Sequence, residues 1–266
     1  GAEQDFLNFT WPLIISFKKD FLFTIINYGT FGEGSLPLFH IINAYLNPFI
    51  FNQIFFQGSI TLISVINVLI FFQIIEKKYN LKKVDALLYS SIFLILPFFR
   101  SSAFWGITEN FGWLFLLLSI KYYNLINKDK SSKQIKLIFL TCLFSSMALY
   151  TRPYMVFFPI FIVLKLLIEK EFSLLRYFLL FFLIFSIPGL ILIHIWDGIF
   201  KLGNNEINLI KDYHNPKYVF KNLLIFSSLF LFYTIPFEFS KKLKFDKKIV
   251  FYFFIIFFII ILQNYL

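Results

Sequence analysis

Residues 53–75 read QIFFQGSITLISVINVLIFFQII, a stretch without a charged side chain, and this stretch decides the fold class. A helix rises about 1.5 Å per residue, so roughly 20 apolar residues cross the ~30 Å hydrocarbon core of a bilayer. Comparable stretches recur, and the expected spans are 53–75, 84–99, 111–127, 137–150, 155–168, 177–196, 219–238 and 249–266. The shorter stretch 36–50 carries a proline near each end and is expected to be a re-entrant or interfacial helix. The sequence thus predicts an all-α, polytopic integral membrane protein with about eight transmembrane helices.

The composition excludes an ordinary soluble domain. Hydrophobic residues make up 59% of the 266 residues and charged residues 15%, and the mean hydropathy is +0.75. Soluble domains average about 45–50% apolar residues and about 25% charged residues. Cys142 is the sole cysteine and lies in an apolar run, which excludes an intrachain disulfide and a thiolate metal cluster. The excess of Phe, Ile, Lys, Asn and Tyr, residues with A/T-rich codons, favours a bacterial source and therefore a bacterial inner-membrane location.

Basic residues divide unequally between the two sides of the expected membrane domain. Most of the 25 Lys and Arg residues fall in the connections around 76–83, 121–136, 165–176 and 241–248. Cytoplasmic loops are enriched in Lys and Arg, so the outer, periplasmic face carries segments 1–35, 100–110 and 197–218. The net charge of +10 is therefore a topology signal. No nucleic-acid partner is expected, because such binding needs a soluble basic face with interleaved aromatics.

A single domain over 1–266 is expected, with an outer-face loop and short helix in 1–52 and a helical membrane core in 53–266. We expect the functional site on the outer face, where polar and irregular sequence is retained. Thr151-Arg152-Pro153 is expected at the tip of a hairpin, because Pro ends a helix and Arg is costly inside a bilayer.

Charged residues mark three of the outer segments. Glu3 and Asp5 lie near the start of the chain, Glu109 directly precedes an expected span, and Arg152 lies in the hairpin tip. Each has a plain alternative explanation. The first segment could be a solvated loop, Glu109 a helix cap, and Arg152 a side chain that snorkels to the interface.

The order of these segments resembles the GT-C superfamily of membrane glycosyltransferases, which use polyprenyl-phosphate-linked sugars. Members carry an acidic motif after their first membrane helix, then a Pro-Leu-Phe-type helix start, then a second acidic residue at a helix start. The acidic motif resembles Glu3/Asp5 here, the helix start resembles Leu36-Pro37-Leu38-Phe39, and the second acidic residue resembles Glu109 in Thr108-Glu109-Asn110. Many members also have a Leu-Thr-Arg-Pro hairpin tip, which Tyr150-Thr151-Arg152-Pro153 resembles. The chain is most similar to the lipid-phosphate-glucose-dependent α-1,2-glucosyltransferases and their bacterial relatives.

The resemblance covers roughly residues 1–170 and departs from the family in two motifs. Glu-Gln-Asp stands in place of adjacent Asp-Glu, and Leu36-Pro37 stands in place of the Pro-Pro found in many members. It implies that the family's first helix precedes Gly1, so the chain is expected to be a fragment. It also implies a hexosyltransferase of cell-envelope glycan biosynthesis. The sugar would pass, with inversion, from a polyprenyl-phosphate donor to a hydroxyl of a glycan, lipid or protein acceptor.

The resemblance also assigns roles to the charged residues. Asp5 is expected to be the general base, with Glu3 as the second choice. Glu109 would position the acceptor or share a divalent cation with Asp5. Mg or Mn is possible as a cofactor, but the spacing requires no metal.

The leaving lipid phosphate needs positive charge. Arg152 and Arg100 are the expected ligands, because Arg makes bidentate phosphate contacts. Lys211 or His214, in the 197–218 loop, could assist. His40 and His194 lie in apolar stretches and are expected to be buried and hydrogen-bonded rather than ligands.

Two other classes remain open. A membrane transporter or lipid flippase would carry broken helices in matching halves. Pro188-Gly189 is expected to break 177–196, but no corresponding segment is visible in the other half. A non-catalytic membrane subunit of a polysaccharide assembly complex is the third possibility.

Overall fold

A computed structural model of the chain describes residues 2–31, 36–126 and 132–196. By its backbone contacts the chain divides into a unit of residues 1–219 and a unit of residues 220–266. The description concerns the first unit. The expected spans 219–238 and 249–266, and the loop that contains Lys211 and His214, lie outside the described residues.

Every element in the described part of the chain is helical, as predicted. In chain order these are α1 (Ala2–Asp5), the π-helical η1 (Phe6–Thr10), α2 (Trp11–Lys19), α3 (Phe21–Ile26), the 3-10 turn η2 (Tyr28–Phe31), α4 (Leu38–Leu46), α5 (Gln53–Tyr79), α6 (Lys83–Ser90), α7 (Ile92–Ile95), α8 (Pro97–Trp105), α9 (Glu109–Tyr123), α10 (Ser132–Thr151), the 3-10 turn η3 (Pro153–Val156), α11 (Phe157–Ile168) and α12 (Phe172–Ile195).

Three of these helices are long and apolar enough to cross a membrane. They are α5, the Lys133–Thr151 part of α10, and α12. A fourth span is possible if the bent pair Lys83–Ile95 and Pro97–Trp105 counts as one. The described residues thus contain membrane-like apolar helices, but fewer full-length ones than the six spans predicted within these residues.

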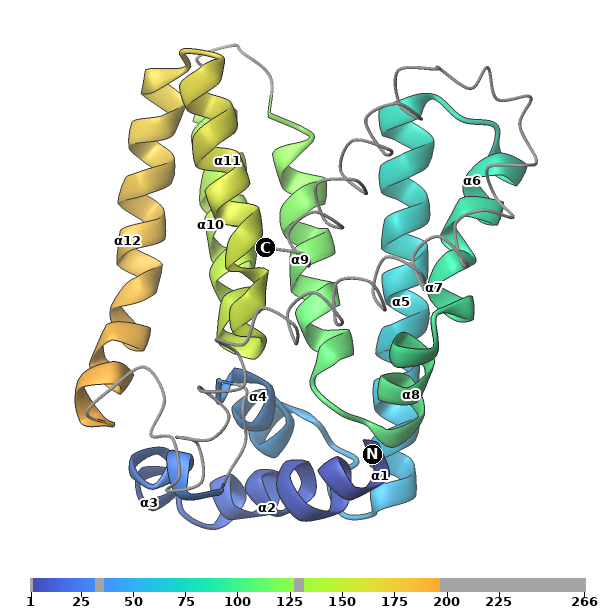
Figure 1. The fold of residues 1–266 in the computed structure, drawn as a ribbon, viewed down its shortest axis with the longest axis vertical. Coiled ribbons are helices and arrows are strands. Elements are labelled where there is room, and N and C mark those ends of the chain that lie inside the picture. The colour runs from blue at the N-terminus through green and yellow to red at the C-terminus, as the bar shows by residue number, and fades with distance from the viewer. Residues whose placement is uncertain (1, 32–35, 127–131, 197–266) are drawn as a thin grey trace, which may run out of the picture. The chain divides into compact units, whose positions relative to one another are not determined.

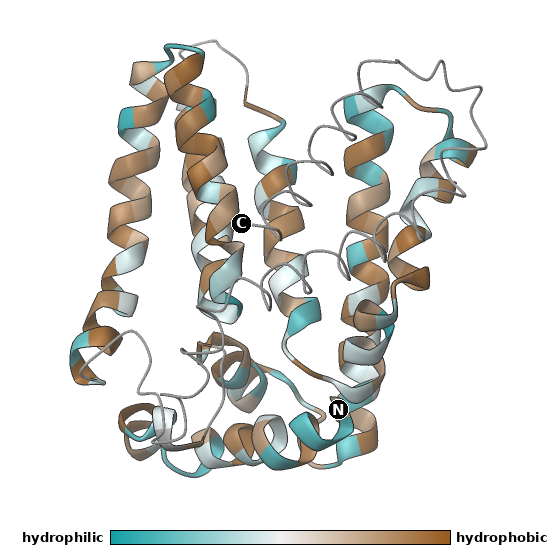
Figure 2. Cartoon of the chain, in the orientation of Figure 1, coloured by the Kyte–Doolittle hydropathy of each residue, from teal (hydrophilic) through white to brown (hydrophobic). Residues whose placement is uncertain are grey.

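Figure 1 shows α5, α9, α10, α11 and α12 as upright helices, with α2, α3 and α4 lying across their lower ends. In Figure 2 hydrophobic residues cover most of α11 and α12. In Figure 1 the chain runs up α5, down through α6, α7 and α8, up α9, down α10, up α11 and down α12. The Lys-rich connections around 76–83 and 165–176 therefore lie at the upper end, as do the end of α9 and the start of α10. The N-terminal helices, the α8–α9 turn and the α10–η3 turn all lie at the lower end (Figure 1). The lower end therefore gathers the described parts of segments 1–35 and 100–110 and the hairpin tip, which the sequence assigned to one face.

The helix α5 confirms the expected span 53–75 and continues to Tyr79. The Asn52 side chain caps its start by accepting from the backbone N–H groups of Ile54 and Phe55, at 2.8 and 3.4 Å. At its end Asn80 adopts a left-handed conformation with φ of 49°. Such caps satisfy backbone groups that a helix end leaves without partners.

The expected span 84–99 is not one straight helix. It contains α6, α7 and the start of α8, and the chain bends by 67° where Leu96 meets Pro97. Pro disfavours the helical conformation in the residue before it, and Leu96 is extended, with ψ of 118°. The expected span 111–127 is also shorter than predicted, since α9 ends at Tyr123.

The predicted hairpin tip is confirmed. The helix α10 ends at Thr151, Arg152 is extended with φ of −139°, and η3 begins at Pro153. The expected break at Pro188-Gly189 is wrong, because α12 continues through Pro188. The reason is the hydroxyl of Tyr150, on α10, which forms hydrogen bonds with the backbone of α12 around Pro188.

Segment 1–35 was expected to be a loop, but its described residues are mostly helical. On α2 the apolar side chains of Leu13, Ile14 and Phe17 share one face and are fully buried. Asp20 caps α3 by accepting from the Phe23 N–H at 2.9 Å. The burial of that apolar face explains why this polar-looking segment folds. The helix expected within 36–50 is confirmed as α4.

Candidate functional site

The lower end of the helices brings Glu109 and Arg152 together. The Arg152 guanidinium donates from Nη2 to Glu109 Oε1 and forms an ion pair with it. The two side chains are only 18% and 22% exposed. Neither of the plain explanations is complete, since the Glu109 side chain bonds to Arg152 and makes no cap hydrogen bond at the start of α9, and the Arg152 side chain is mostly shielded from solvent. The arrangement is a partly buried charge pair.

Local structure places each partner. Glu109 is the first residue of α9, which follows the left-handed Gly106 that ends α8. A side chain at Gly106 would meet Phe56 Cε1 at 3.1 Å, so this turn needs glycine for its φ of +72° and for space. Arg152 is the extended residue between α10 and Pro153. The two turns lie 43 residues apart in sequence.

Neighbouring residues hold the Glu109 and Arg152 side chains in place. The Ser102 hydroxyl, from α8, donates to Glu109 Oε2 at 3.3 Å. Gly112, one turn along α9, leaves room for the Arg152 stem, because a Cβ there would lie 3.3 Å from Arg152 Cγ. The Nε of Arg152 is buried and has no hydrogen-bond partner among the described residues. A donor of this kind is available to an anion or a hydroxyl.

His40 lies close to this pair and is neutral. Its ring is fully buried on α4, and its Nδ1 lies 3.1 Å from the Tyr28 hydroxyl. Burial lowers the pKa of His40 to about 3, and the positive charge of Arg152 adds to that effect. The prediction of a buried, hydrogen-bonded His40 is therefore confirmed. The same prediction for His194 is wrong, because that side chain is exposed near the end of α12.

Glu3 and Asp5 lie on α1 and are exposed. This helix packs against α8, the helix that contributes Ser102 to Glu109. Next to Asp5, Phe6 is buried and stacks on Phe56 with a centroid distance of 5.9 Å. The acidic motif thus belongs to the same end of the molecule as Glu109. In the described residues Arg152 pairs with Glu109 and not with the acidic motif.

Arg100 is exposed on α8. No group of three or more His, Cys, Asp or Glu residues converges on a metal-binding geometry within 2–31, 36–126 and 132–196. The described carboxylates therefore do not fit a three-ligand metal site.

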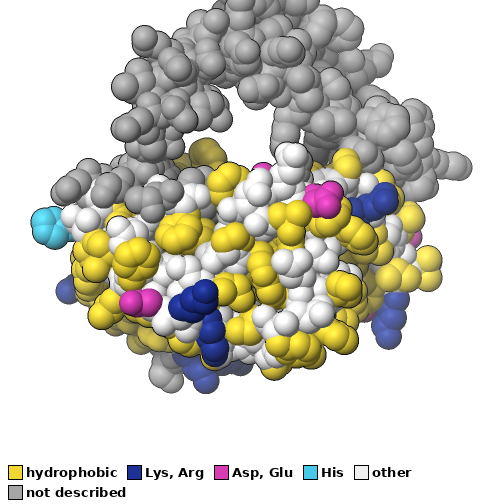
Figure 3. All heavy atoms as spheres, turned by 90° about the horizontal axis from the view of Figure 1, so that it is seen from below, with side chains coloured by type: hydrophobic (Ala, Val, Ile, Leu, Met, Phe, Trp, Pro, Cys, Tyr) yellow, Lys and Arg dark blue, Asp and Glu magenta, His cyan; other side chains and the backbone are white. Residues whose placement is uncertain are grey.

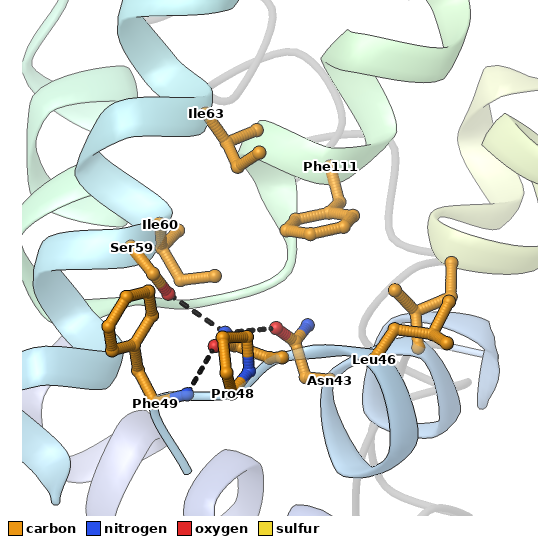
Figure 4. A pocket seen from close by; sticks show the side chains of 10 residues that line it. Asn43, Leu46, Pro48, Phe49, Ser59, Ile60, Ile63 and Phe111 are labelled. Atoms are coloured by element: carbon orange, nitrogen blue, oxygen red, sulfur yellow. Dashed lines mark hydrogen bonds between the residues drawn. The ribbon is translucent and has the colours of Figure 1, made fainter.

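An apolar cavity of about 220 Å³ lies beside the site, between α4, α5 and α9 (Figure 4). Phe111, two residues after Glu109, contributes to its wall, and Asn47 bonds to Asn43 and Ser59 at its edge. The lining residues are Ile42, Asn43, Leu46, Asn47, Pro48, Phe49, Ser59, Ile60, Ile63 and Phe111. Pockets for drug-sized molecules are usually about 300–1,000 Å³, so this cavity suits a smaller apolar group.

The lower end also exposes much apolar surface. Figure 3 shows hydrophobic side chains spread over this face among polar side chains and backbone, with few charged groups. Leu22 and Phe23 of α3 are 68% and 58% exposed, and Leu46 of α4 is 75% exposed. Exposed apolar area of this kind is typical of proteins that contact a membrane.

Sequence reasoning missed Ser102, Gly112 and Tyr150. A serine or a glycine on an apolar helix has no pattern that reveals its partner, so these roles appear only when the helices are packed. Tyr150 belongs to the hairpin motif, but the resemblance assigns no role to it.

No protein-family model, no curated protein and no solved structure matches this chain.

Proposed function

We propose that this chain is part of an integral membrane glycosyltransferase. It would transfer a sugar from a polyprenyl-phosphate donor to a hydroxyl of a glycan, lipid or protein acceptor. The reaction would take place on the periplasmic face of a bacterial inner membrane. The observation that carries the proposal is the Glu109–Arg152 pair. It joins two of the four motifs on which the resemblance to the GT-C superfamily rests.

A guanidinium at the end of apolar helices suits a lipid phosphate. Arg binds phosphate through two parallel N–H groups, and the charge that develops on the leaving phosphate is the charge to be stabilised. Arg152 Nε is a buried donor without a partner in the described residues, so the side chain retains capacity for a second acceptor. Glu109 would hold the guanidinium until the phosphate arrives and would then be released to the acceptor hydroxyl.

The proposed reaction is a single displacement. The acceptor oxygen bonds to the anomeric carbon while the bond from that carbon to the phosphate oxygen breaks. The acceptor proton goes to Asp5, and the electron pair leaves with the lipid phosphate, so the anomeric centre inverts. Asp5 on α1 adjoins α8, which supports its role as the base.

One observation favours the transporter or flippase alternative. The bend of 67° between Lys83–Ile95 and Pro97–Trp105 has the form of a broken span or a re-entrant loop. Discontinuous helices are common in transporters. That alternative predicts movement of a lipid-linked sugar without its consumption.

The test uses the full-length protein in membranes with radiolabelled polyprenyl-phosphate sugars. Wild type should consume one of the donors, and Arg152→Ala and Asp5→Asn should each lower the rate by at least about 100-fold. Arg176→Ala and Glu169→Gln, at the opposite end of the helices, are the matched controls and should leave the rate unchanged. Wild-type protein that consumes no donor would contradict the proposal, and donor translocation without consumption would support the alternative.

A further inference from the structure

The Tyr150 hydroxyl lies inside the hydrogen-bond ladder of α12. It donates to the Phe185 carbonyl at 2.7 Å and accepts from the Gly189 N–H at 2.8 Å. In a regular helix the N–H of Gly189 would itself donate to Phe185, four residues earlier. The adjacent Pro188 has no N–H, and its ring disturbs the preceding turn. The hydroxyl thus bridges a gap in α12, which explains why the helix continues past Pro188.

Gly189 leaves the space that the Tyr150 ring occupies. A Cβ at this position would lie 2.7 Å from Tyr150 Cε1 and 2.9 Å from its hydroxyl oxygen, closer than real Cβ contacts. Glycine costs about 1 kcal/mol relative to Ala inside a helix. Its presence in α12 therefore has a steric reason, namely the close approach of α10.

A second contact fixes the lower end of α12. Trp196 donates from Nε1 to the Ile25 carbonyl at 2.7 Å, and its ring stacks on Tyr28 at 5.5 Å. Tyr28 in turn contacts His40 beside the Arg152 charge. Elsewhere α12 is little buried, with only Leu175 and Phe178 in the core. The lower part of α12 is thus held at two points, and both adjoin the surroundings of Arg152.

The turn that carries Arg152 follows directly from Tyr150. The Arg152 N–H still donates to the Ala148 carbonyl of α10 at 2.8 Å, so this residue moves with the last turn of the helix. The Arg152 stem also passes close to Gly112, which leaves little room for a shift. A displacement of Tyr150 would therefore displace the guanidinium from Glu109.

We infer that Tyr150 is a positioning residue, whose hydroxyl, locked between Phe185 and Gly189 of α12, holds the end of α10 and fixes the Arg152 guanidinium against Glu109. The inference concerns the protein without substrate. Only its consequence for sugar transfer rests on the proposed function.

The test measures the reactivity of Arg152 in full-length protein in membranes. Phenylglyoxal modifies arginine, and peptide mass spectrometry resolves the three arginines of the chain, with exposed Arg100 and Arg176 as internal references. Tyr150→Phe removes both hydrogen bonds of the hydroxyl, and Gly189→Ala pushes the ring away from α12. In each variant the Arg152 rate should rise by about fivefold. The reference rates should not change.

Two matched variants control for the substitutions themselves. Tyr177→Phe removes a hydroxyl from α12 near its other end, and Gly58→Ala adds a methyl group to α5, where no atom lies within 4 Å. Neither should change the Arg152 rate. The buried thiol of Cys142 reports the fold and should stay unreactive towards maleimide. If Gly189→Ala exposes this thiol, Tyr150→Phe alone decides the question.

An unchanged Arg152 rate in Tyr150→Phe would overturn the inference, as would an equal rise in Tyr177→Phe. The donor assay separates this result from the proposed function. If the protein transfers sugar, Tyr150→Phe should raise KM for the donor more than it lowers kcat. If no donor is consumed, the proposed function fails, but the arginine reactivity still decides the role of Tyr150.

Discussion

The Arg152 and Glu109 side chains are each only about one-fifth exposed, so each charge has lost most of its hydration. Each charge therefore depends on the other for compensation. Removing one member of a buried pair leaves the remaining charge without compensation, whereas removing both can be nearly neutral. Their partial exposure reduces the effect below that of a fully buried pair. The charge pair is therefore expected to contribute to stability as well as to function.

Glu109→Gln should lower the free energy of unfolding by about 1–2 kcal/mol, because the Arg152 charge then lacks its partner. The double variant Glu109→Gln/Arg152→Gln should lose less than the sum of the two single variants. Thermal unfolding in detergent measures these losses of stability. Glu169→Gln, which disrupts the exposed pair with Lys165, is the control and should change stability by no more than about 0.5 kcal/mol. Additive losses for Glu109 and Arg152 would show that the two side chains do not interact.

His40 makes the stability depend on pH. Its pKa is about 3 in the folded protein and about 6.5 when unfolded, so below pH 6.5 the unfolded chain binds a proton that the folded protein does not. Stability should therefore fall as the pH is lowered from 6.5 towards 3, by about 1.4 kcal/mol per pH unit. His40→Gln should remove this slope between pH 6.5 and 5. Parallel pH profiles for the variant and wild type would contradict the assignment.

At the scale of elements, turns and breaks decide where the charged residues lie. The Pro97 bend, the Gly106 turn and the Arg152–Pro153 break set the starts of α8, α9 and η3. Pro and Gly are visible in a sequence, which is why the hairpin tip could be predicted from Thr151-Arg152-Pro153. The continuity of α12 could not be predicted, because it depends on a hydroxyl that comes from another helix.

Gly106→Ala tests the turn that positions Glu109. The φ of +72° is strained for a residue with a side chain, and the added methyl group would press on Phe56 at 3.1 Å. We expect a loss of about 1–2 kcal/mol in stability, measured by thermal unfolding. Gly58→Ala, which replaces a helical glycine in open space, should be neutral or slightly stabilising. Equal effects of the two substitutions would show that the turn places no demand on Gly106.

At the scale of the whole molecule, hydrophobic run length predicted helices and the distribution of Lys and Arg predicted which connections share an end. Run length alone overestimated the number of full-length spans, since 84–99 bends at Pro97 and α9 has 15 residues. A loop is predicted for segment 1–35 because its polar residues obscure the apolar face that α2 buries. The pairing of Glu109 with Arg152 was beyond sequence reasoning, because 43 residues separate them.

Cysteine labelling in intact cells tests the orientation. The positive-inside rule assigns the upper end, with Lys77 and Lys78, to the cytoplasm. A cysteine placed at exposed Asn80 should therefore be protected from a membrane-impermeant maleimide until the cells are opened. A cysteine at exposed Asn52, at the other end of α5, should react in intact cells. The reverse pattern would place the Glu109–Arg152 pair on the cytoplasmic face.

The most direct measurement of the central claim is the binding of radiolabelled polyprenyl phosphate, the proposed leaving group, to the full-length protein in lipid nanodiscs. Arg152→Ala should weaken binding by about 10–100-fold, as expected for the loss of a charge-assisted contact, while Arg176→Ala should bind like wild type. Equal affinity of wild type and Arg152→Ala would contradict the claim that this end of the molecule receives a lipid phosphate.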